Sequence, residues 1–242
     1  MTPNSQADRN EALIRGIQMQ YVESSHGTYL WIHSETSMRT LNSSPWGGGF
    51  GSYKGIMNRQ VDMLYNEADP IGEMHDFMTV EGLNPLEAAG MLTAAIVNHV
   101  GFCSMTWEQD EEVPNLEPLQ VCVWATVGLG NKARAGAELP ASSLYPGTIN
   151  TIVVINGKLT DAAMVNAVIT ATEAKSAALQ ALNVHVGDLP ATGTTTDAVV
   201  IAATDRGPLY AYAGTATRLG YLIGRTVYEA ILASCQLSAK TP

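Results

Sequence analysis

Positive charge is scarce in this sequence. Lys and Arg together contribute 13 of the 242 residues, against 23 Asp and Glu, so the formal net charge is −10 at pH 7. No cluster of basic residues interrupts this balance. Proteins that bind a nucleic-acid backbone carry a basic patch or stripe, because contacts with the phosphates supply much of the affinity. We therefore expect no nucleic-acid partner.

Long apolar runs and metal-ligand spacings are also missing. No stretch approaches the roughly 18 consecutive apolar residues of a transmembrane helix, and residues 1–15 lack the basic-then-apolar order of a secretory signal. Cys103, Cys122 and Cys235 each stand in apolar sequence, and neither they nor the five histidines show Cys-x-x-Cys or His-x-x-x-His spacing. We expect free buried thiols, no metal, no membrane contact and a cytoplasmic location.

Hydrophobic residues, in contrast, are abundant. Hydrophobic residues make up 46% of the chain and charged residues 15%, a composition that excludes a disordered protein. The length is at the upper end of what one hydrophobic core serves, and neither an internal repeat nor a long linker divides the chain. We therefore expect a single domain over residues 1–242.

The first part of the chain reads as strands and one helix. Apolar and polar residues alternate over 16–23, which predicts a half-buried strand, and 28–33 follows closely enough for a hairpin. Residues 42–55 are glycine-rich and predict a loop. Asn84 and Pro85 are typical of a helix start and predict a helix to about residue 99.

Strands and helices then alternate. Strands are predicted at 100–107 and 120–127, around an acidic connection at 108–118 that is typical of a solvated loop. The remaining predicted elements are a strand at 148–155, a turn at Asn156-Gly157, a helix at 161–182 capped by Thr160, a strand at 197–203 and a last helix from 214 to about 235. This order predicts an α+β layered fold, with helices packed on a mixed, largely antiparallel sheet that includes one parallel pair within 148–203.

One face of the helix at 161–182 is polar. Asn166, Thr170 and Glu173 stand at i, i+4 and i+7 and therefore share that face. A solvated face usually carries several Lys and Glu, whereas Asn and Thr are poor helix formers. The stripe either faces water or lines a pocket, and the sequence leaves both interpretations open.

Hydroxyl-rich and glycine-rich loops are the other candidate ligand contacts. Residues 191–198 place four Thr, one Gly and Asp197 before a strand, where they either surround a polar substrate group or form a turn with Asp197 as a local acceptor. The glycine runs at 47–51 and 126–136 match neither phosphate-binding fingerprint, which disfavours a nucleotide-binding protein. No Gly-x-Ser-x-Gly elbow occurs, which disfavours a conventional serine hydrolase.

Taken together, these segments resemble the adenosylcobinamide amidohydrolase (CbiZ-type) family. The similar stretches appear in the family's order and cover roughly Trp46 to Ala230. They are Gly47–Gly51, Thr126–Gly136, Gly147–Asn150, Asn166–Lys175, Ala191–Asp197, and Tyr212–Thr215 with Leu219-Gly220 and Ile223–Arg225.

The resemblance implies hydrolysis of the amide that joins aminopropanol to a propionate side chain of the corrin ring. The products would be adenosylcobyric acid and 1-aminopropan-2-ol, and the corrinoid would be the substrate, with no cofactor. From these motifs we predict five catalytic residues, Glu173, Asn150, Lys175, Asp197 and Thr194. We predict eight substrate-binding residues, Gly48, Gly49, Phe50, Asn131, Asn166, Thr170, Thr192 and Thr215. A corrin needs a wide groove, and Trp46, Phe50 and Tyr53 either cover a ring face or belong to the core.

Two mechanisms fit these residues. In the first, Glu173 is the general base for water, Asn150 donates to the carbonyl oxygen, and Lys175, about 200° further round the helix, anchors Asp197. In the second, Thr192 or Thr194 attacks the carbonyl, and Ala191-Thr192 is similar to the cleavage site of self-processing N-terminal-threonine hydrolases. The alternative function is a non-catalytic corrinoid-binding or trafficking protein. The apolar C-terminal helix leaves room for a homo-oligomer.

Overall fold

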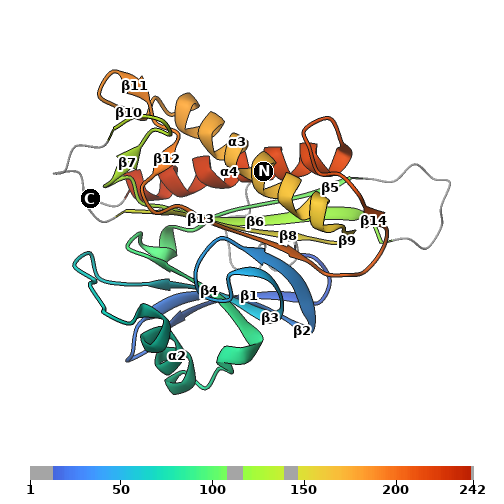
Figure 1. Cartoon of the computed structure of the whole chain (residues 1–242), viewed down its shortest axis with the longest axis horizontal. Coiled ribbons are helices and arrows are strands. Elements are labelled where there is room, and N and C mark those ends of the chain that lie inside the picture. Colours follow the sequence, from blue (N-terminus) through green and yellow to red (C-terminus); the bar gives the residue numbers. More distant parts are fainter. Residues whose placement is uncertain (1–12, 108–116, 139–146, 241–242) are drawn as a thin grey trace.

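The computed structural model describes residues 13–107, 117–138 and 147–240 (Figure 1). The predicted acidic connection at 108–118 falls largely outside these residues. The main strands are β1 (Ile17–Glu23), β2 (Thr28–Asn42), β3 (Gly49–Gln60), β4 (Ala88–Thr93), β5 (Gly101–Trp107), β6 (Leu119–Val127), β8 (Ile149–Ile155) and β13 (Ala198–Ala203). The α-helices are α2 (Pro70–Val80), α3 (Asp161–Ala181) and α4 (Arg218–Ala239). Two-residue strands complete the described part: β7 (Lys132–Ala133), β9 (Lys158–Leu159), β10 (His185–Val186), β11 (Leu189–Pro190), β12 (Gly193–Thr194) and β14 (Leu209–Tyr210).

The eight main strands form one sheet that folds over on itself. Its order is β4-β3-β2-β13-β8-β6-β5, with β1 also paired to β2. The long strand β2 changes register against β3 between His33 and Met38, pairing with β1 before that irregularity and with β13 after it. Only β3–β4 and β8–β13 are parallel among these pairs. The predicted mixed, largely antiparallel sheet is therefore confirmed, as is the parallel pair within 148–203.

Helices cover both outer faces of the folded sheet, so the molecule has four layers (Figure 1). One apolar core, which includes Leu30, Ile56 and Trp124, lies between the two halves of the sheet. A second core lies under α3 and α4, and a smaller one lies under α2. Strand β8 has apolar cores on both of its faces, and every one of its residues is buried.

The helix layer over β5, β6, β8 and β13 follows from local sequence. Thr160 caps α3 by accepting a hydrogen bond from the backbone N–H of Ala163 at 3.1 Å, as predicted. Helix α4 approaches β5 closely at Gly101, where a Cβ atom would lie 1.9 Å from the carbonyl oxygen of Ala230. Glycine is therefore required at this position for the helix to reach the sheet.

Two local predictions are wrong. The expected helix over 84–99 stops after one 3₁₀ turn at Pro85–Glu87, although Asn84 caps it by accepting from the N–H of Leu86 at 3.1 Å. The chain then forms β4, because pairing with β3 buries its apolar residues, and this tertiary contact overrides helix propensity. The expected loop over 42–55 is shorter, since β3 begins at Gly49 within the glycine run.

Within the described residues, no helix is long and apolar enough to cross a bilayer. The three cysteines are free, and burial raises the pKa of each thiol to about 11.

Candidate functional site

A groove opens at one end of the molecule, where the first residues of β8 and β13 meet the last residues of β3 and β4. It consists of three adjoining hollows of about 540, 360 and 280 Å³. The wide hollow is lined by residues 61–66, 92–94, 131, 147–148 and 195–196. The middle hollow is lined by residues 43–46, 65, 70–71, 74, 91–92 and 196–198, and the narrow hollow by 43, 149, 151, 168, 171–172, 175 and 197–199.

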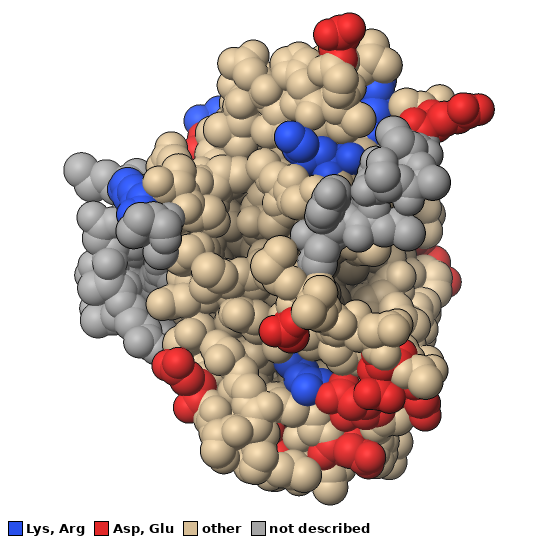
Figure 2. Space-filling model, turned by 90° about the vertical axis from the view of Figure 1, so that its left-hand side faces the viewer, with Lys and Arg blue, Asp and Glu red and all other residues tan. Residues whose placement is uncertain are grey.

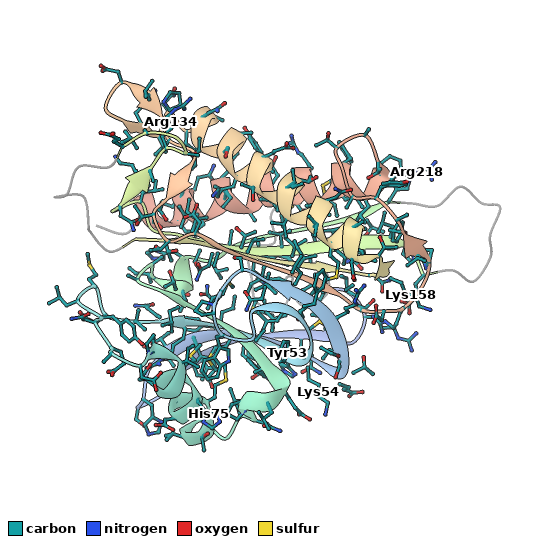
Figure 3. The ribbon with its side chains drawn as sticks, in the orientation of Figure 1. Tyr53, Lys54, His75, Arg134, Lys158 and Arg218 are labelled. Atoms are coloured by element: carbon teal, nitrogen blue, oxygen red, sulfur yellow. The ribbon has the colours of Figure 1, made fainter. Side chains whose placement is uncertain are left out.

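Figure 2 shows this end of the molecule, with a hollowed surface of mostly uncharged residues and acidic side chains gathered below it, over α2. The carboxylates near α2 include Glu67, Asp69 and Asp76. On the opposite side of the groove, Arg134 donates to the carbonyl oxygen of Pro190 at 2.7 Å and fixes the β10–β11 hairpin (Figure 3). Acidic side chains therefore gather beside the groove, whereas the described residues that line it are mostly uncharged apart from Asp62, Lys175 and Asp197.

Asp197 is the most highly coordinated carboxylate in the groove. Its Oδ1 accepts from the backbone N–H groups of Ile149 (3.1 Å) and Thr194 (3.0 Å) and from the Thr194 hydroxyl, and its Oδ2 pairs with Lys175. The Lys175 and Asp197 side chains are 14% and 16% exposed. The predicted anchoring of Asp197 by Lys175 is confirmed, and the predicted local turn around Asp197 is present as well.

Glycine at position 193 makes this ion pair possible. A Cβ atom there would lie 2.2 Å from Asp197 Oδ2 and 2.7 Å from Lys175 Nζ. Any side chain would therefore push the two charges apart. The Gly-Thr-Thr-Thr-Asp motif thus supplies a hydroxyl, one backbone donor and this close approach around its carboxylate, and Ile149 supplies the second backbone donor.

Asn150 lies beneath the groove and is 1% exposed. Its amide group donates to Asn58 Oδ1 at 2.8 Å and to the carbonyl oxygen of Leu92 at 2.9 Å. Asn58 in turn donates to the Thr126 hydroxyl at 3.0 Å. Since both N–H bonds of Asn150 go to protein acceptors, neither is left for a substrate carbonyl, and Asn150 instead joins the two halves of the sheet beneath the groove.

The wall formed by loop 61–66 is held by an ion pair. Arg59 binds both carboxylate oxygens of Glu73 at 2.6 Å, and the Tyr65 hydroxyl donates to the same carboxylate at 3.2 Å. Arg59 also lies 3.8 Å from the centroid of the Phe77 ring. Hydrogen bonds from Arg59 lower the pKa of Glu73 below its ordinary value, and they outweigh the opposing effect of burial.

Glu173, Thr170 and Thr215 lie outside the groove. They line a separate outer hollow of about 380 Å³ between α3 and α4, together with Tyr221 and Tyr228. Thr170 donates to the carbonyl oxygen of Ala213 at 2.8 Å, and Glu173 is exposed. The shared face predicted from the helical wheel exists for Thr170 and Glu173, but it points away from Lys175 and Asp197, so the structure divides the predicted site in two.

The remaining predicted residues have separate positions. Asn131 lines the wide hollow and donates to the Thr195 hydroxyl at 2.6 Å. Thr192 accepts from the N–H of Ala135 at 2.9 Å and borders none of the three hollows.

Gly48, Gly49 and Phe50 lie just beyond the turn whose residues 43–46 line the groove, and Phe50 contacts Arg39. Asn166 lies on α3, partly exposed, and borders neither the groove nor the outer hollow.

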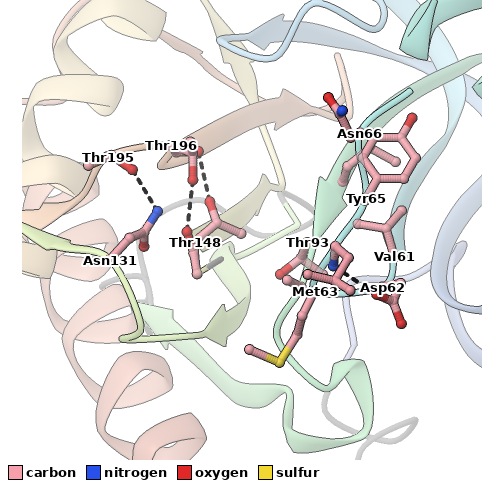
Figure 4. A pocket seen from close by; sticks show the side chains of 14 residues that line it. Val61, Asp62, Met63, Tyr65, Asn66, Thr93, Asn131, Thr148, Thr195 and Thr196 are labelled. Carbon is pink, nitrogen blue, oxygen red and sulfur yellow. Dashed lines mark hydrogen bonds between the residues drawn. The ribbon is translucent and has the colours of Figure 1, made fainter. Parts of the chain in front are cut away.

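Tyr65 and Thr148, which line the groove, and Asn58, which lies beneath it, were not predicted from the sequence. Thr148 donates to the carbonyl oxygen of Thr196 at 2.7 Å and joins the two strand entries (Figure 4). Asn58 had a recognisable signal, because an amide that directly follows the apolar segment Gly55–Met57 in a strand needs a buried partner.

The chemistry open to the groove follows from its titratable groups. Among the described residues that line it, these are Asp62, Tyr65, Lys175 and Asp197. The described part of the chain holds no cluster of three His, Cys, Asp or Glu side chains suited to a metal ion. A lysine and a carboxylate beside strand-end hydroxyls and backbone N–H groups suit the polarisation and hydrolysis of an acyl group.

Comparison with known proteins identifies a family and relatives of this chain. The model of the family described as adenosylcobinamide amidohydrolase (CbiZ) matches residues 11–241. An adenosylcobinamide amidohydrolase of Halobacterium salinarum is 41% identical over 120 residues, which span 47% of this chain and 49% of that protein. An adenosylcobinamide amidohydrolase of Methanosarcina mazei is 29% identical over 199 residues, 78% of this chain and 86% of that protein. The alignment thus spans about half of the first relative and most of the second.

A solved structure supports the fold independently. The crystal structure of the PH0078 protein from Pyrococcus horikoshii OT3 superposes with a TM-score of 0.54 at 10% identity, over 98% of this chain and 88% of that one. At this identity the likeness concerns the fold alone. The family model, in contrast, covers nearly the whole sequence, and the chain therefore belongs to the adenosylcobinamide amidohydrolase (CbiZ) family.

Proposed function

We propose that this protein hydrolyses the aminopropanol amide of adenosylcobinamide or a related corrinoid, giving adenosylcobyric acid and 1-aminopropan-2-ol. The observation that carries this proposal is the match of the family model to residues 11–241. The groove supports it, because three adjoining hollows offer the extended site that a macrocycle with a long side chain requires. The corrinoid is the substrate, no further cofactor takes part, and the expected location is the cytoplasm.

In the proposed reaction, water adds to the acyl carbon and the carbon–nitrogen bond then breaks. One proton of the water passes to the Asp197 carboxylate and is delivered to the departing amine nitrogen, while the water oxygen remains on the acyl carbon as the new carboxyl group. Lys175 donates to the carbonyl oxygen as it gains negative charge, and its pairing with Asp197 holds it at that position. Thr194 fixes the carboxylate from the other side.

This assignment moves the general base from Glu173 to Asp197. Glu173 borders the outer hollow, whereas Asp197 borders both the middle and the narrow hollow of the groove. Geometry also favours water over the threonine mechanism for Thr192, whose hydroxyl already accepts from Ala135 and borders none of the groove's hollows.

The test is release of 1-aminopropan-2-ol from adenosylcobinamide by the purified chain, followed by mass spectrometry of both products. Stoichiometric release of the amine and adenosylcobyric acid supports the proposal. Binding of adenosylcobinamide without release would instead identify a non-catalytic corrinoid-binding protein. Intact-mass measurement of the chain separates the mechanisms, since cleavage before Thr192 or an acyl-enzyme adduct would overturn the water mechanism. Size-exclusion chromatography at several concentrations tests for a homo-oligomer.

A further inference from the structure

Loop 61–66 presents two large apolar side chains to water at the mouth of the wide hollow. Leu64 is 88% exposed and Met63 is 61% exposed, and both line that hollow. Exposed apolar side chains are common singly, but two adjacent ones at the rim of a concave site form a ready contact surface. A third, Ile71, is 51% exposed and borders the adjoining middle hollow.

The loop is anchored on both sides of this apolar tip. Before it, the N–H of Val61 donates to the carbonyl oxygen of Thr93 at 2.8 Å. After it, the N–H of Tyr65 donates to the carbonyl oxygen of Asp62 at 3.0 Å, and the Tyr65 hydroxyl reaches Glu73. Met63 and Leu64 therefore stand on a backbone fixed by the fold, and they do not need to be ordered when a ligand arrives.

The opposite wall of the wide hollow has a different character. It consists of Asn131, Thr148, Thr195 and Thr196, which are tied together by hydrogen bonds from Asn131 to Thr195 and from Thr148 to the carbonyl oxygen of Thr196. Figure 4 shows these polar side chains on one side of the hollow and Val61, Met63 and Tyr65 on the other, together with Asp62, Asn66 and Thr93. The hollow thus combines a wall that carries an exposed apolar tip, Met63 and Leu64, with a facing wall of hydroxyl and amide groups.

We propose that the apolar tip, Met63 and Leu64, seats the flat apolar face of the corrin ring, and that the facing Thr/Asn wall receives the amide groups at the ring's edge. This inference rests on the proposed function and makes the tip a specificity determinant of that site. A ligand with one apolar face and an amide fringe matches the two walls of the hollow in chemistry. Small linear amides lack such an apolar face, so contact with the tip does not strengthen their binding.

The order of the three hollows also sets the orientation of the substrate in the groove. The wide and middle hollows share Tyr65, Leu92 and Thr196, and the middle and narrow hollows share Asp197 and its neighbours. With the ring in the wide hollow, the aminopropanol-bearing side chain extends along the middle hollow toward Lys175 and Asp197. The tip acts on ring binding and leaves the reacting amide untouched.

The experiment compares binding and turnover of adenosylcobinamide by the wild-type chain and by the double variant Met63→Ser/Leu64→Ser. Equilibrium dialysis, read by the visible absorbance of the corrin, gives the Kd. Loss of two apolar contact surfaces is expected to weaken binding by about tenfold or more. The kcat should stay within about threefold, because a contact equally strong in ground and transition states affects KM alone.

Leu86→Ser/Leu209→Ser is the matched control, since these residues are 81% and 65% exposed and border none of the three hollows. The swap Met63→Leu/Leu64→Met keeps the apolar surface and should retain wild-type Kd. Thermal melting confirms that each variant is folded.

Weakened binding in the serine variant alone supports the inference. Equal Kd in the serine variant and the wild type overturns it, and so does a wild-type chain that binds no adenosylcobinamide. A wild-type chain that binds the corrinoid but releases no amine overturns the proposed reaction, while the comparison of Kd values still decides the role of the tip.

Discussion

The position of the catalytic carboxylate can be tested by exchanging one atom at either of two sites. Asp197→Asn and Glu173→Gln each replace a carboxylate by an amide of almost the same shape. The groove geometry predicts that Asp197→Asn lowers kcat by at least about 100-fold, the usual effect of losing a general base. That loss corresponds to about 2.7 kcal/mol in the activation barrier. Glu173→Gln should change kcat by less than about threefold, because the side chain is exposed on the far side of α3.

The two variants should also differ in stability. In Asp197→Asn, the amide oxygen can still accept from Ile149 and Thr194, but an N–H group then faces the Lys175 ammonium. The side chains of this pair are about one-sixth exposed, so the cost lies between the 0–1 kcal/mol of surface pairs and the 3–5 kcal/mol of broken buried pairs. About 2 kcal/mol is expected, which lowers the Tm by about 4–8 °C for a chain of this length.

Steady-state release of 1-aminopropan-2-ol and thermal melting are the two assays. Glu87→Gln is the control, because it breaks the ion pair with Lys54 in which both side chains are nearly half exposed, and it should change the Tm by less than about 2 °C. A 100-fold loss of kcat in Glu173→Gln, with near wild-type turnover in Asp197→Asn, would refute the assignment of the base. It would place catalysis in the outer hollow.

Three further predictions concern stability and reactivity. Gly101→Ala should destabilise the chain by about 3 kcal/mol or more in denaturant unfolding, because its Cβ would overlap the Ala230 carbonyl, whereas Gly224→Ala on α4, whose Cβ has no neighbour closer than 3.8 Å, should stabilise it slightly. The lowered pKa of Glu73 means that its bond with Arg59 contributes stability above the ordinary pKa of 4.5 and loses it as the pH falls below that value. The Tm of Glu73→Gln should therefore fall less than that of the wild type over this acidic range, and an equal fall would contradict the linkage. Because burial raises the pKa of all three cysteine thiols to about 11, iodoacetamide at neutral pH should label the native chain far more slowly than the unfolded chain, as mass spectrometry can measure.

Local sequence rules correctly predicted the elements whose capping residues or residue pattern lie within the element itself or directly beside it. Helix α3 begins where Thr160 caps it, and β8 follows from its β-branched run. The segment 88–93 shows where such rules stop, because its Ala, Gly, Met and Leu residues carry no strand signal without β3 beside them. The folding of the sheet into two halves depends on the register change within β2, and no single window of sequence contains that information.

The sequence predicted only part of the site. The phase of α3 correctly separated Lys175 from Glu173, and Lys175 indeed meets Asp197. The helical periodicity does not predict which side of α3 faces the groove, because α3 packs against the sheet on one side and against α4 on another. Tyr65 lines the groove through its contact with α2, and Asn58 lies beneath the groove through contacts with distant strands; spacing along the chain encodes neither.

The amide pair beneath the groove has a consequence for substitutions at the rim. Asn58 belongs to the half of the sheet covered by α2 and Asn150 to the half covered by α3 and α4, so their hydrogen bond acts as a spacer between the two walls. The separation of the walls is thereby set inside the core, by groups that no ligand touches. Substitutions at the exposed rim, such as Met63 or Leu64, are therefore expected to leave the distance between the two walls unchanged.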